Sequence, residues 1–208
     1  MTMRIADRWA RFDAALPSLG LPGVALAPGV SDAALEEFET ATQLHLPVGV
    51  RQWFQGHDGQ TSNKAGLAAG FYFVSLSEAQ KLMTDWATTL TKLGTGVKDL
   101  DRACRSHPPK AIQRKYSTPA WLPLARDSEG NCVGVDLNPG PAGSSGQVIN
   151  FGRDEEDKYV LFPSAAGLLE WLTAELEAGH IALDIEDGVV RHIAGRLVSA
   201  IIDSQGVD

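Results

Sequence analysis

The feature that most constrains the fold is a block of four short apolar segments between Trp121 and Phe162. The segments cover residues 121–125, 132–137, 147–151 and 158–162. Each is rich in β-branched or aromatic residues, which favour strands. Polar turns at Asp127–Asn131 and Arg153–Asp157 make two of the connections, and a broader polar loop at 138–146 makes the third. Because strands joined by short turns pair directly, this spacing predicts an antiparallel meander.

Helical periodicity dominates the sequence before this block. Ile5, Trp9 and Phe12 recur at the spacing of one helix face, and Pro17 ends that helix. Further helices are predicted to begin at Ser31 or Asp32, at Pro47, at Ser77 and at Ser164. Helices, then strands, then another helix favour an α+β fold over a βαβ repeat.

Local signals predict the connections between the helices. The proline- and glycine-rich stretch Leu21–Val30 is expected to be a loop. Gly59 is expected as the C′ glycine of the third helix, which would place His57–Asp58 at the helix end. Ser77 and Gln80 fit a capping box that opens the fourth helix.

The sequence predicts no regular structure for residues 93–118, but it does predict structure near the C-terminus. Residues 93–118 contain glycine, proline and many charges, and we expect a long, mobile excursion there. Beyond the last predicted helix, Asp187–Gly188 is typical of a hairpin turn, and residues 194–202 favour a short helix.

Charge is unevenly distributed along the chain. The 18 basic and 26 acidic side chains give a net charge of −8, and most of the excess lies in residues 154–208. An acidic surface repels nucleic acid and attracts a basic partner, although it also serves simply to keep a protein dissolved. The basic stretch 98–115 has only Tyr116 beside it for base stacking, so we expect no direct nucleic-acid binding.

No catalytic or metal-binding motif is complete. The five histidines and the two cysteines, Cys104 and Cys132, lack the spacing of zinc sites, and no phosphate-binding loop or nucleophile elbow occurs. We therefore expect no enzyme, no metal and no cofactor. The sequence also has no apolar run of membrane-spanning length and no signal peptide at its start, so the expected location is the cytoplasm.

Tryptophan is the residue type whose placement matters most for binding. Trp53, Trp86, Trp121 and Trp171 each fall on an apolar stripe or strand, so a core position is expected for all four. Any of them that is exposed would be a credible interface anchor.

Several segments in a fixed order resemble the SUKH superfamily, the Smi/Knr type. They are Leu46–Pro47 before Trp53–Phe54, His57–Gln60, Gly66–Leu67, Trp121–Ala125, Asp127 with Gly130–Asn131, Asp136, Pro139–Pro141, Gly143, Gly146–Ile149, Ser164 and Trp171–Leu172. The resemblance implies a single domain with a central, mostly antiparallel sheet flanked by helices, and no catalytic activity. It covers about residues 31–175, and it suggests three segments: an N-terminal helix and loop at 1–30, a SUKH-like domain at 31–178 with an insertion at 94–118, and an acidic extension at 179–208 packed on the domain.

The resemblance also implies two kinds of function. Many bacterial members are immunity proteins that neutralise a toxin by binding it, and fungal members are adaptors in cell-wall integrity signalling. The resemblance, the absent export signal and the acidic surface rank the immunity hypothesis first. Such adaptors usually carry long disordered arms, which this sequence almost lacks, and this counts against the adaptor. An acidic immunity protein would suit a cognate protein toxin with a basic, nuclease-type domain.

Polar loops supply the candidate partner-binding residues under the immunity hypothesis. They are Asp58, Gly59, Gln60, Asp127, Asn131, Asp136, Asn138 and Gln147. The alternative is that these residues only make turns. Charge reversal at Asp136 is expected to weaken toxin binding with little loss of melting temperature, and the oligomeric state stays open.

Overall fold

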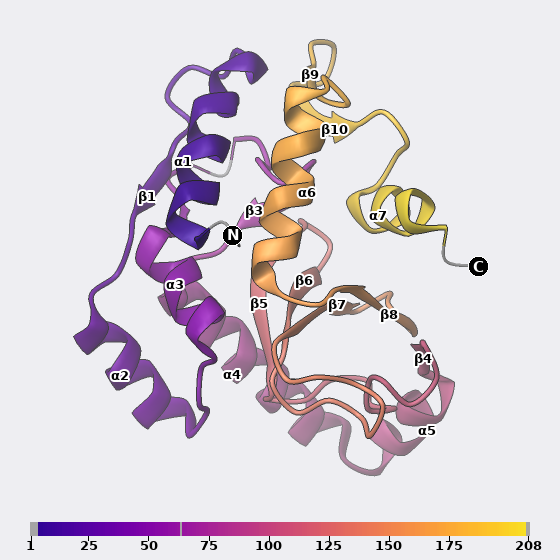
Figure 1. The fold of residues 1–208 in the computed structure, drawn as a ribbon. Helices are drawn as coiled ribbons and strands as arrows, with labels where there is room; N and C mark the ends of the chain where they lie inside the picture. Colours follow the sequence, from indigo (N-terminus) through magenta and orange to yellow (C-terminus); the bar gives the residue numbers. More distant parts are fainter. Residues whose placement is uncertain (1–3, 63, 207–208) are drawn as a thin grey trace.

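A six-stranded sheet organises the computed structural model, which describes residues 4–62 and 64–206 (Figure 1). Its strands are β3 (Tyr72–Phe73), β4 (Arg105–His107), β5 (Trp121–Arg126), β6 (Asn131–Asp136), β7 (Gln147–Gly152) and β8 (Asp157–Phe162). Their order across the sheet is β3-β5-β6-β7-β8-β4. All neighbours are antiparallel except β4, which runs parallel to β8. The predicted meander is therefore confirmed as β5 to β8, and the fold is α+β.

Both faces of this sheet are buried. Side chains alternate between the faces of a strand, so Val133 and Val135 of β6 join the main core while Cys132 joins a second, smaller one. That second core forms where Ala111 and Ile112 cover the far face of the sheet. Burial on both sides explains why these strands are apolar at almost every position.

Helices cover the other face. They are α1 (Ile5–Ala15), α2 (Asp32–Thr42), α3 (Val48–Gly56), α4 (Leu76–Leu93), α6 (Ala165–Glu177) and α7 (Leu197–Gln205), with short 3-10 turns at Leu16–Leu19 and Gly94–Gly96. The remaining helix, α5 (Val97–Ala103), contributes no residue to this core. Figure 1 shows α1, α3 and α6 side by side, and all three contact one another. Trp9 of α1 packs edge to face on Trp53 of α3 and on Phe73 of β3, which ties these helices to the edge of the sheet. None of the described helices is long and apolar enough to cross a membrane.

The prediction for the end of the third helix is wrong. Helix α3 ends at Gly56, and His57–Gln60 form strand β2, which pairs antiparallel with β1 (Leu26–Pro28) inside the predicted loop. Gly59 has φ 77°, but it lies within β2, where a Cβ would be 2.6 Å from the backbone nitrogen of Ser75. The glycine is therefore needed for close backbone approach and not to end a helix.

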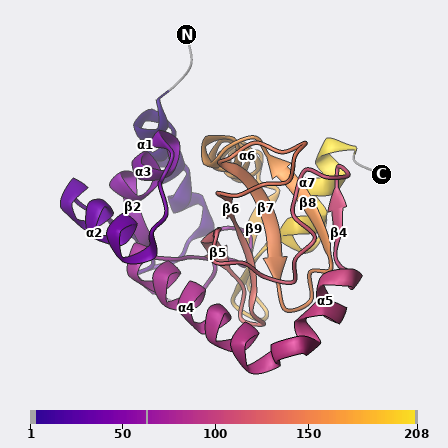
Figure 2. The same ribbon diagram turned by 90° about the horizontal axis from the view of Figure 1, so that it is seen from below.

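Two further expectations are corrected around α4. Its N-cap is Ser75, whose hydroxyl accepts a hydrogen bond from the backbone N–H of Glu78 at 3.1 Å, so the proposed box at Ser77 and Gln80 is displaced by two residues. Residues 93–118 are also not a structureless excursion, because they contain α5 and β4. Figure 2 shows α4 running along the side of the molecule and turning sharply into α5.

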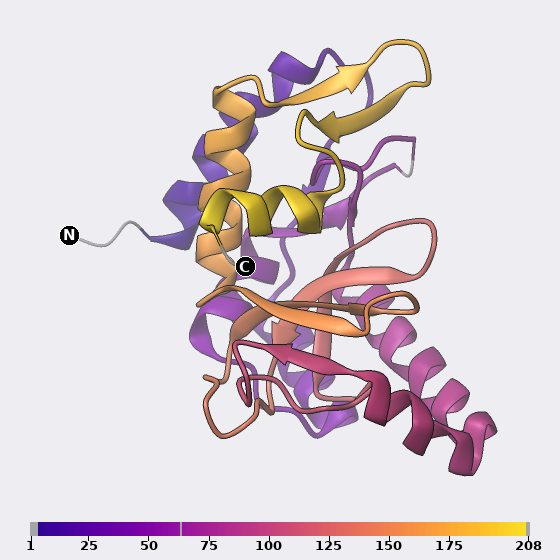
Figure 3. The same ribbon diagram turned by 90° about the vertical axis from the view of Figure 1, so that its right-hand side faces the viewer.

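The C-terminal segment adds a hairpin and a helix. Strands β9 (Ile181–Asp184) and β10 (Val189–His192) pair antiparallel around the predicted Asp187–Gly188 turn, and α7 follows. Leu197 and Ile201 of α7 lie in the main core. The hairpin and the α4–α5 corner occupy opposite ends of the molecule (Figure 3).

Candidate functional site

The first group of predicted binding residues lies on β2. The Asp58 carboxylate accepts a hydrogen bond from the backbone N–H of Leu76 at 2.6 Å, at the start of α4. The Gln60 amide donates to the carbonyl of Ala65 at 2.8 Å and accepts from the backbone N–H of Phe73 at 3.1 Å. These two side chains and the close-packed Gly59 fasten β2 to its neighbours.

The second group makes the turn between β5 and β6. One carboxylate oxygen of Asp127 accepts backbone N–H groups of Glu129, Gly130 and Asn131 at 2.8, 2.9 and 2.8 Å. The other accepts the Asn131 side-chain amide at 3.0 Å and the Arg196 guanidinium at 3.2 Å. Asp127 thus organises the turn and also binds the C-terminal segment.

The third group lies at the other end of β6. Asp136 accepts the backbone N–H of Asn138 at 3.0 Å and the amide of Gln147 at 3.2 Å, and it is 0% exposed. Gln147 is also buried and donates to the carbonyl of Ala111 at 3.0 Å, whereas Asn138 is exposed. Burial raises the pKa of the Asp136 carboxyl, and the hydrogen bonds from Asn138 and Gln147 oppose that rise.

The structure does not bring the three groups together. The second and third groups lie at opposite ends of β6, about 17 Å apart for a strand of this length. Asn131, Asp136 and Gln147 are buried, so a partner would reach them only if the loops opened. Charge reversal at Asp136 would therefore place an unpaired charge in the interior, and we expect a large loss of stability from it.

A groove at the α4–α5 corner is the more accessible apolar feature. It has a volume of about 430 Å³ and lies between the second half of α4, α5 and the β5–β6 turn. Its apolar lining consists of Leu82, Trp86, Leu93, Leu100 and Tyr116. Trp86 is half-buried and Leu93 is 40% exposed, so this lining is open to solvent.

Charged side chains surround the groove. Asp85 pairs with Lys81 at 2.6 Å, Arg126 with Glu78 at 2.7 Å, and Glu129 with Arg196 at 3.2 Å. The exposed guanidinium of Arg153 forms no ion pair with any other residue of the described ranges. An apolar floor beside one unneutralised cation suits an apolar side chain that has an acidic neighbour.

The structure corrects the expectation that Trp86 is a core residue. Trp53 and Trp121 are almost fully buried as predicted, but Trp86 and Trp171 are only partly buried. The stripe of Leu82, Trp86 and Leu90 has helical spacing, but the sheet reaches only the first part of α4, where Leu76, Ala79 and Met83 are buried. Spacing alone identifies an apolar face without showing what covers it.

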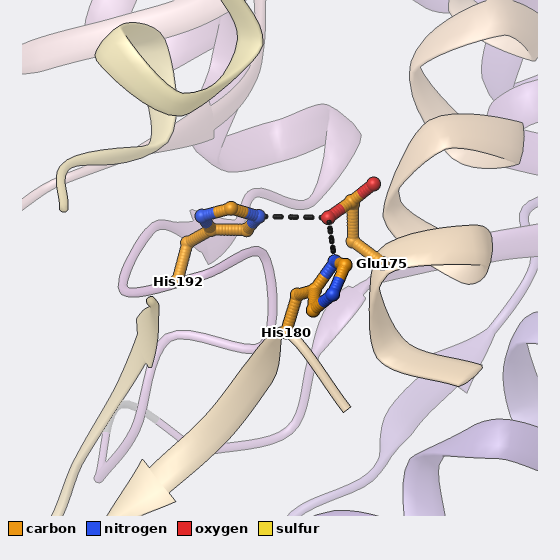
Figure 4. A group of neighbouring side chains, drawn as sticks. All are labelled: Glu175, His180 and His192. Atoms are coloured by element: carbon orange, nitrogen blue, oxygen red, sulfur yellow. Dashed lines mark hydrogen bonds and ion pairs between the residues drawn. The ribbon is translucent and has the colours of Figure 1, made fainter. Parts of the chain in front are cut away.

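A second cluster was not anticipated from the sequence. Glu175 at the end of α6, His180 just before β9 and His192 at the end of β10 converge on one another (Figure 4). One carboxylate oxygen of Glu175 lies 2.8 Å from Nδ1 of His180 and 2.8 Å from Nε2 of His192. Both contacts favour the ionised carboxylate and hold the pKa of Glu175 below its ordinary value, although partial burial, the largest single influence, acts the other way. Separations of 5 and 17 residues match no motif that sequence inspection would reveal.

The sequence is similar to a known protein family and to several named fungal proteins. A sequence model of the SMI1 / KNR4 family (SUKH-1) matches residues 29–173. The Schizosaccharomyces pombe protein named cell wall biosynthesis/cell cycle regulator smi1 is 34% identical in an alignment of length 178, and the match covers 82% of this chain and 35% of that protein. A Neurospora crassa glucan synthesis regulatory protein is 33% identical in an alignment of length 191, and that match covers 76% of this chain and 36% of its own length.

A Saccharomyces cerevisiae protein named cell wall assembly regulator SMI1 shows the same relationship. It is 31% identical in an alignment of length 172, and the match covers 68% of this chain and 34% of the yeast protein. The chain therefore spans about a third of the length of the curated relatives that it matches.

Proposed function

The chain belongs to the SMI1/KNR4 family (SUKH-1), and from that premise we propose that it is a non-catalytic regulator of cell-wall assembly that acts in the cytoplasm by binding other proteins. The observation that carries the proposal is the match to the S. pombe regulator over 82% of the chain. The N. crassa and S. cerevisiae relatives also have names that describe regulation of glucan synthesis or cell-wall assembly.

This proposal reverses the order of the two functions that the sequence suggested. The immunity hypothesis ranked first on the resemblance and on the acidic composition of the chain. The named relatives favour the regulator, which ranked second. Membership of the family, together with several relatives whose names describe one process, is stronger support than a judgement about composition.

We place the partner contact at the groove beside Trp86. A regulator of this kind needs an accessible surface, and protein interfaces are typically anchored by a few aromatic or arginine side chains that fill or line a pocket. The groove supplies Trp86 and Tyr116 on its floor and Arg153 at its edge. The buried loop residues Asp136 and Gln147 supply no such surface.

A segment exchange in yeast tests the regulatory function. The whole chain replaces the matching segment of the S. cerevisiae regulator, and growth is scored in the presence of a cell-wall-binding dye and of a wall-digesting enzyme. We expect the chimera to restore resistance to a strain that lacks the regulator. A matched chimera carrying Gly134→Ala, which we expect to be strongly destabilised, is the negative control. A chimera that accumulates in cells and still gives no resistance would contradict the proposal.

The charge distribution supports a second candidate function. The net charge of −8, concentrated in residues 154–208, suits an immunity protein that neutralises a basic toxin. Isolation of the tagged chain from its native host separates the candidates. One stoichiometric partner with a toxic domain would support immunity, and proteins of cell-wall synthesis would support the regulator.

A further inference from the structure

We propose that Glu175, His180 and His192 form a binding site for a divalent transition-metal ion, with Zn²⁺ as the ion tested. Each residue offers one ligand atom, and the three atoms all lie within 4.8 Å of one another. Figure 4 shows them pointing toward one another from the end of α6, from the position just before β9 and from the end of β10. Within the described residues, this is the one group of three potential ligands at such distances.

The ligand types and spacing suit zinc. Imidazole nitrogen and carboxylate oxygen bind Zn²⁺ at about 2.0–2.2 Å, which places the ligand atoms of a tetrahedral site about 3.3–3.5 Å apart. The two contacts to Glu175 are 2.8 Å, so each imidazole nitrogen would move away from the carboxylate oxygen by about 0.5–0.7 Å around an ion. The two imidazole nitrogens lie within 4.8 Å of each other and would settle at the same tetrahedral spacing. Two imidazoles among three ligands disfavour Mg²⁺ and Ca²⁺, which prefer oxygen.

The site is open on one side. The side chain of His180 is 46% exposed and that of Glu175 is 20% exposed, whereas His192 is almost buried. An ion can therefore enter from solvent and keep water as its fourth ligand. Trp171 stacks on the His192 ring at 5.5 Å, which holds that ring in place and provides a fluorescent reporter next to the site.

One hydrogen bond to His192 is lost when the ion binds. The backbone N–H of Ala194 donates to Nδ1 of His192 at 3.0 Å, so in the metal-free state the ring proton is on Nε2 and faces Glu175. Metal at Nε2 displaces that proton, and Nδ1 then carries a proton that repels the Ala194 N–H. The turn at 193–195 is exposed and short, and one neutral hydrogen bond is weak compared with three metal–ligand bonds.

The other three histidines each pair with a carboxylate, and they can be compared with the proposed zinc site. His45 pairs with Glu39 at 3.3 Å, His57 with Asp13 at 3.0 Å and His107 with Asp157 at 2.9 Å. Among residues 4–62 and 64–206, none of these three histidines belongs to a group of three potential ligands, so these pairs should bind zinc much more weakly than the three-residue site.

Titration of the chelator-treated, tag-free full chain with ZnCl₂ tests the proposal. Calorimetry and the total tryptophan fluorescence are recorded together, and the Ala194 amide is followed by NMR. We expect one equivalent of zinc, a fluorescence change that Trp171→Phe removes, and a shift of the Ala194 amide signal. His180→Ala and Glu175→Gln should each weaken binding at least tenfold, whereas the matched control His45→Ala should leave the affinity unchanged.

Circular dichroism shows whether each variant is folded. His180→Ala lies at an exposed position, so it keeps the test valid if Glu175→Gln does not fold. If zinc shows no one-to-one binding, or if His180→Ala leaves that binding unchanged, the three residues are only a hydrogen-bonded clamp and the proposal fails. Neither result bears on the regulatory function proposed above.

Discussion

The indole ring of Trp86 meets the phenol ring of Tyr116 edge to face, with centroids 5.5 Å apart. Tyr116 is held in turn by its backbone N–H, which donates to Asp101 at 2.8 Å, and by its hydroxyl, which donates to the carbonyl of Arg153 at 3.2 Å. The segment that follows α4 is thereby fastened back onto α4. This contact forms the floor of the groove that we assign to partner binding.

Trp86→Ala is expected to reduce partner binding at least tenfold, which is about 1.4 kcal/mol. The change removes the largest apolar surface in the groove. The stability cost should stay near 1 kcal/mol, because the ring is only half-buried. Recovery of the partner on the tagged chain measures the first effect, and urea unfolding measures the second. Thr88→Ala, at an exposed position of the same helix, is the control, and equal recovery on both variants would remove the groove from the proposal.

Asp136→Asn is expected to change how stability depends on pH. The pKa of the Asp136 carboxyl is raised mainly by burial, so the folded state holds the proton more tightly than the unfolded chain does. That contribution is complete below the unfolded pKa of about 3.9 and is lost as pH rises through the folded pKa. The free energy of unfolding of wild type minus that of the variant should therefore be larger at about pH 4 than at about pH 7.

Urea unfolding of both proteins across this range checks the difference. Asp136→Asn should also lower stability by about 1–3 kcal/mol at all pH values, because the introduced amide faces the amide of Gln147. Asp203→Asn, at an exposed position of α7, is the control. A wild-type-minus-variant difference that is flat with pH, or that grows toward neutral pH, would contradict the assignment.

Gly134→Ala is expected to cost about 3 kcal/mol or more, because overpacking here acts on backbone. A Cβ at this position would lie 2.2 Å from the carbonyl oxygen of Leu122 and 2.8 Å from Cα of Pro123, so β5 and β6 would have to separate. Gly49→Ala on α3 is the matched control, since nothing lies within 4 Å of its Cβ position. The control should be neutral or gain about 0.5–1 kcal/mol from helix propensity. Thermal or urea unfolding that ranks the two changes equally would show that the strands are not packed this closely.

Both cysteines are expected to be unreactive in the folded protein. Cys104 and Cys132 are buried, and burial raises the pKa of both thiols, that of Cys132 to about 12. The thiolate is the reactive form, so a colorimetric thiol reagent at about pH 8 should label neither residue quickly. Both should react at once in denaturant. Fast labelling of Cys104 in the folded protein would mean that α5 opens readily.

The sequence predicted the elements whose local pattern is strong. The alternation and turn residues of 121–162 specify β5 to β8, and Asp187–Gly188 specifies the last hairpin. Ser75 and Ser77 each stand three residues before a Glu or a Gln, so two capping boxes fit the sequence around α4. The box that begins at Ser75 is favoured because Leu76 is buried and its backbone N–H donates a hydrogen bond to Asp58.

The candidate sites were harder to predict because they depend on contacts across the fold. Six of the eight candidate residues lie in strands, and only Asp127 and Asn138 lie between them. The sequence also could not show that Asp136 and Gln147 are buried. Trp86 had the spacing of a core residue, and only its distance from the sheet leaves it accessible. Glu175 and His192 come from different elements, and only the return of the hairpin onto α6 brings them together.

What the sequence determined by itself was the α+β class, the meander and the family, because these depend on residue order and on local periodicity. Tertiary structure alone decided the pairing of β1 with β2, the parallel position of β4 and the composition of both sites. The physical reason is that such contacts join segments far apart along the chain. These contacts stabilise the fold by burying surface and pairing backbone groups, and they do so only once the distant segments have come together. A local pattern of residues therefore cannot predict them.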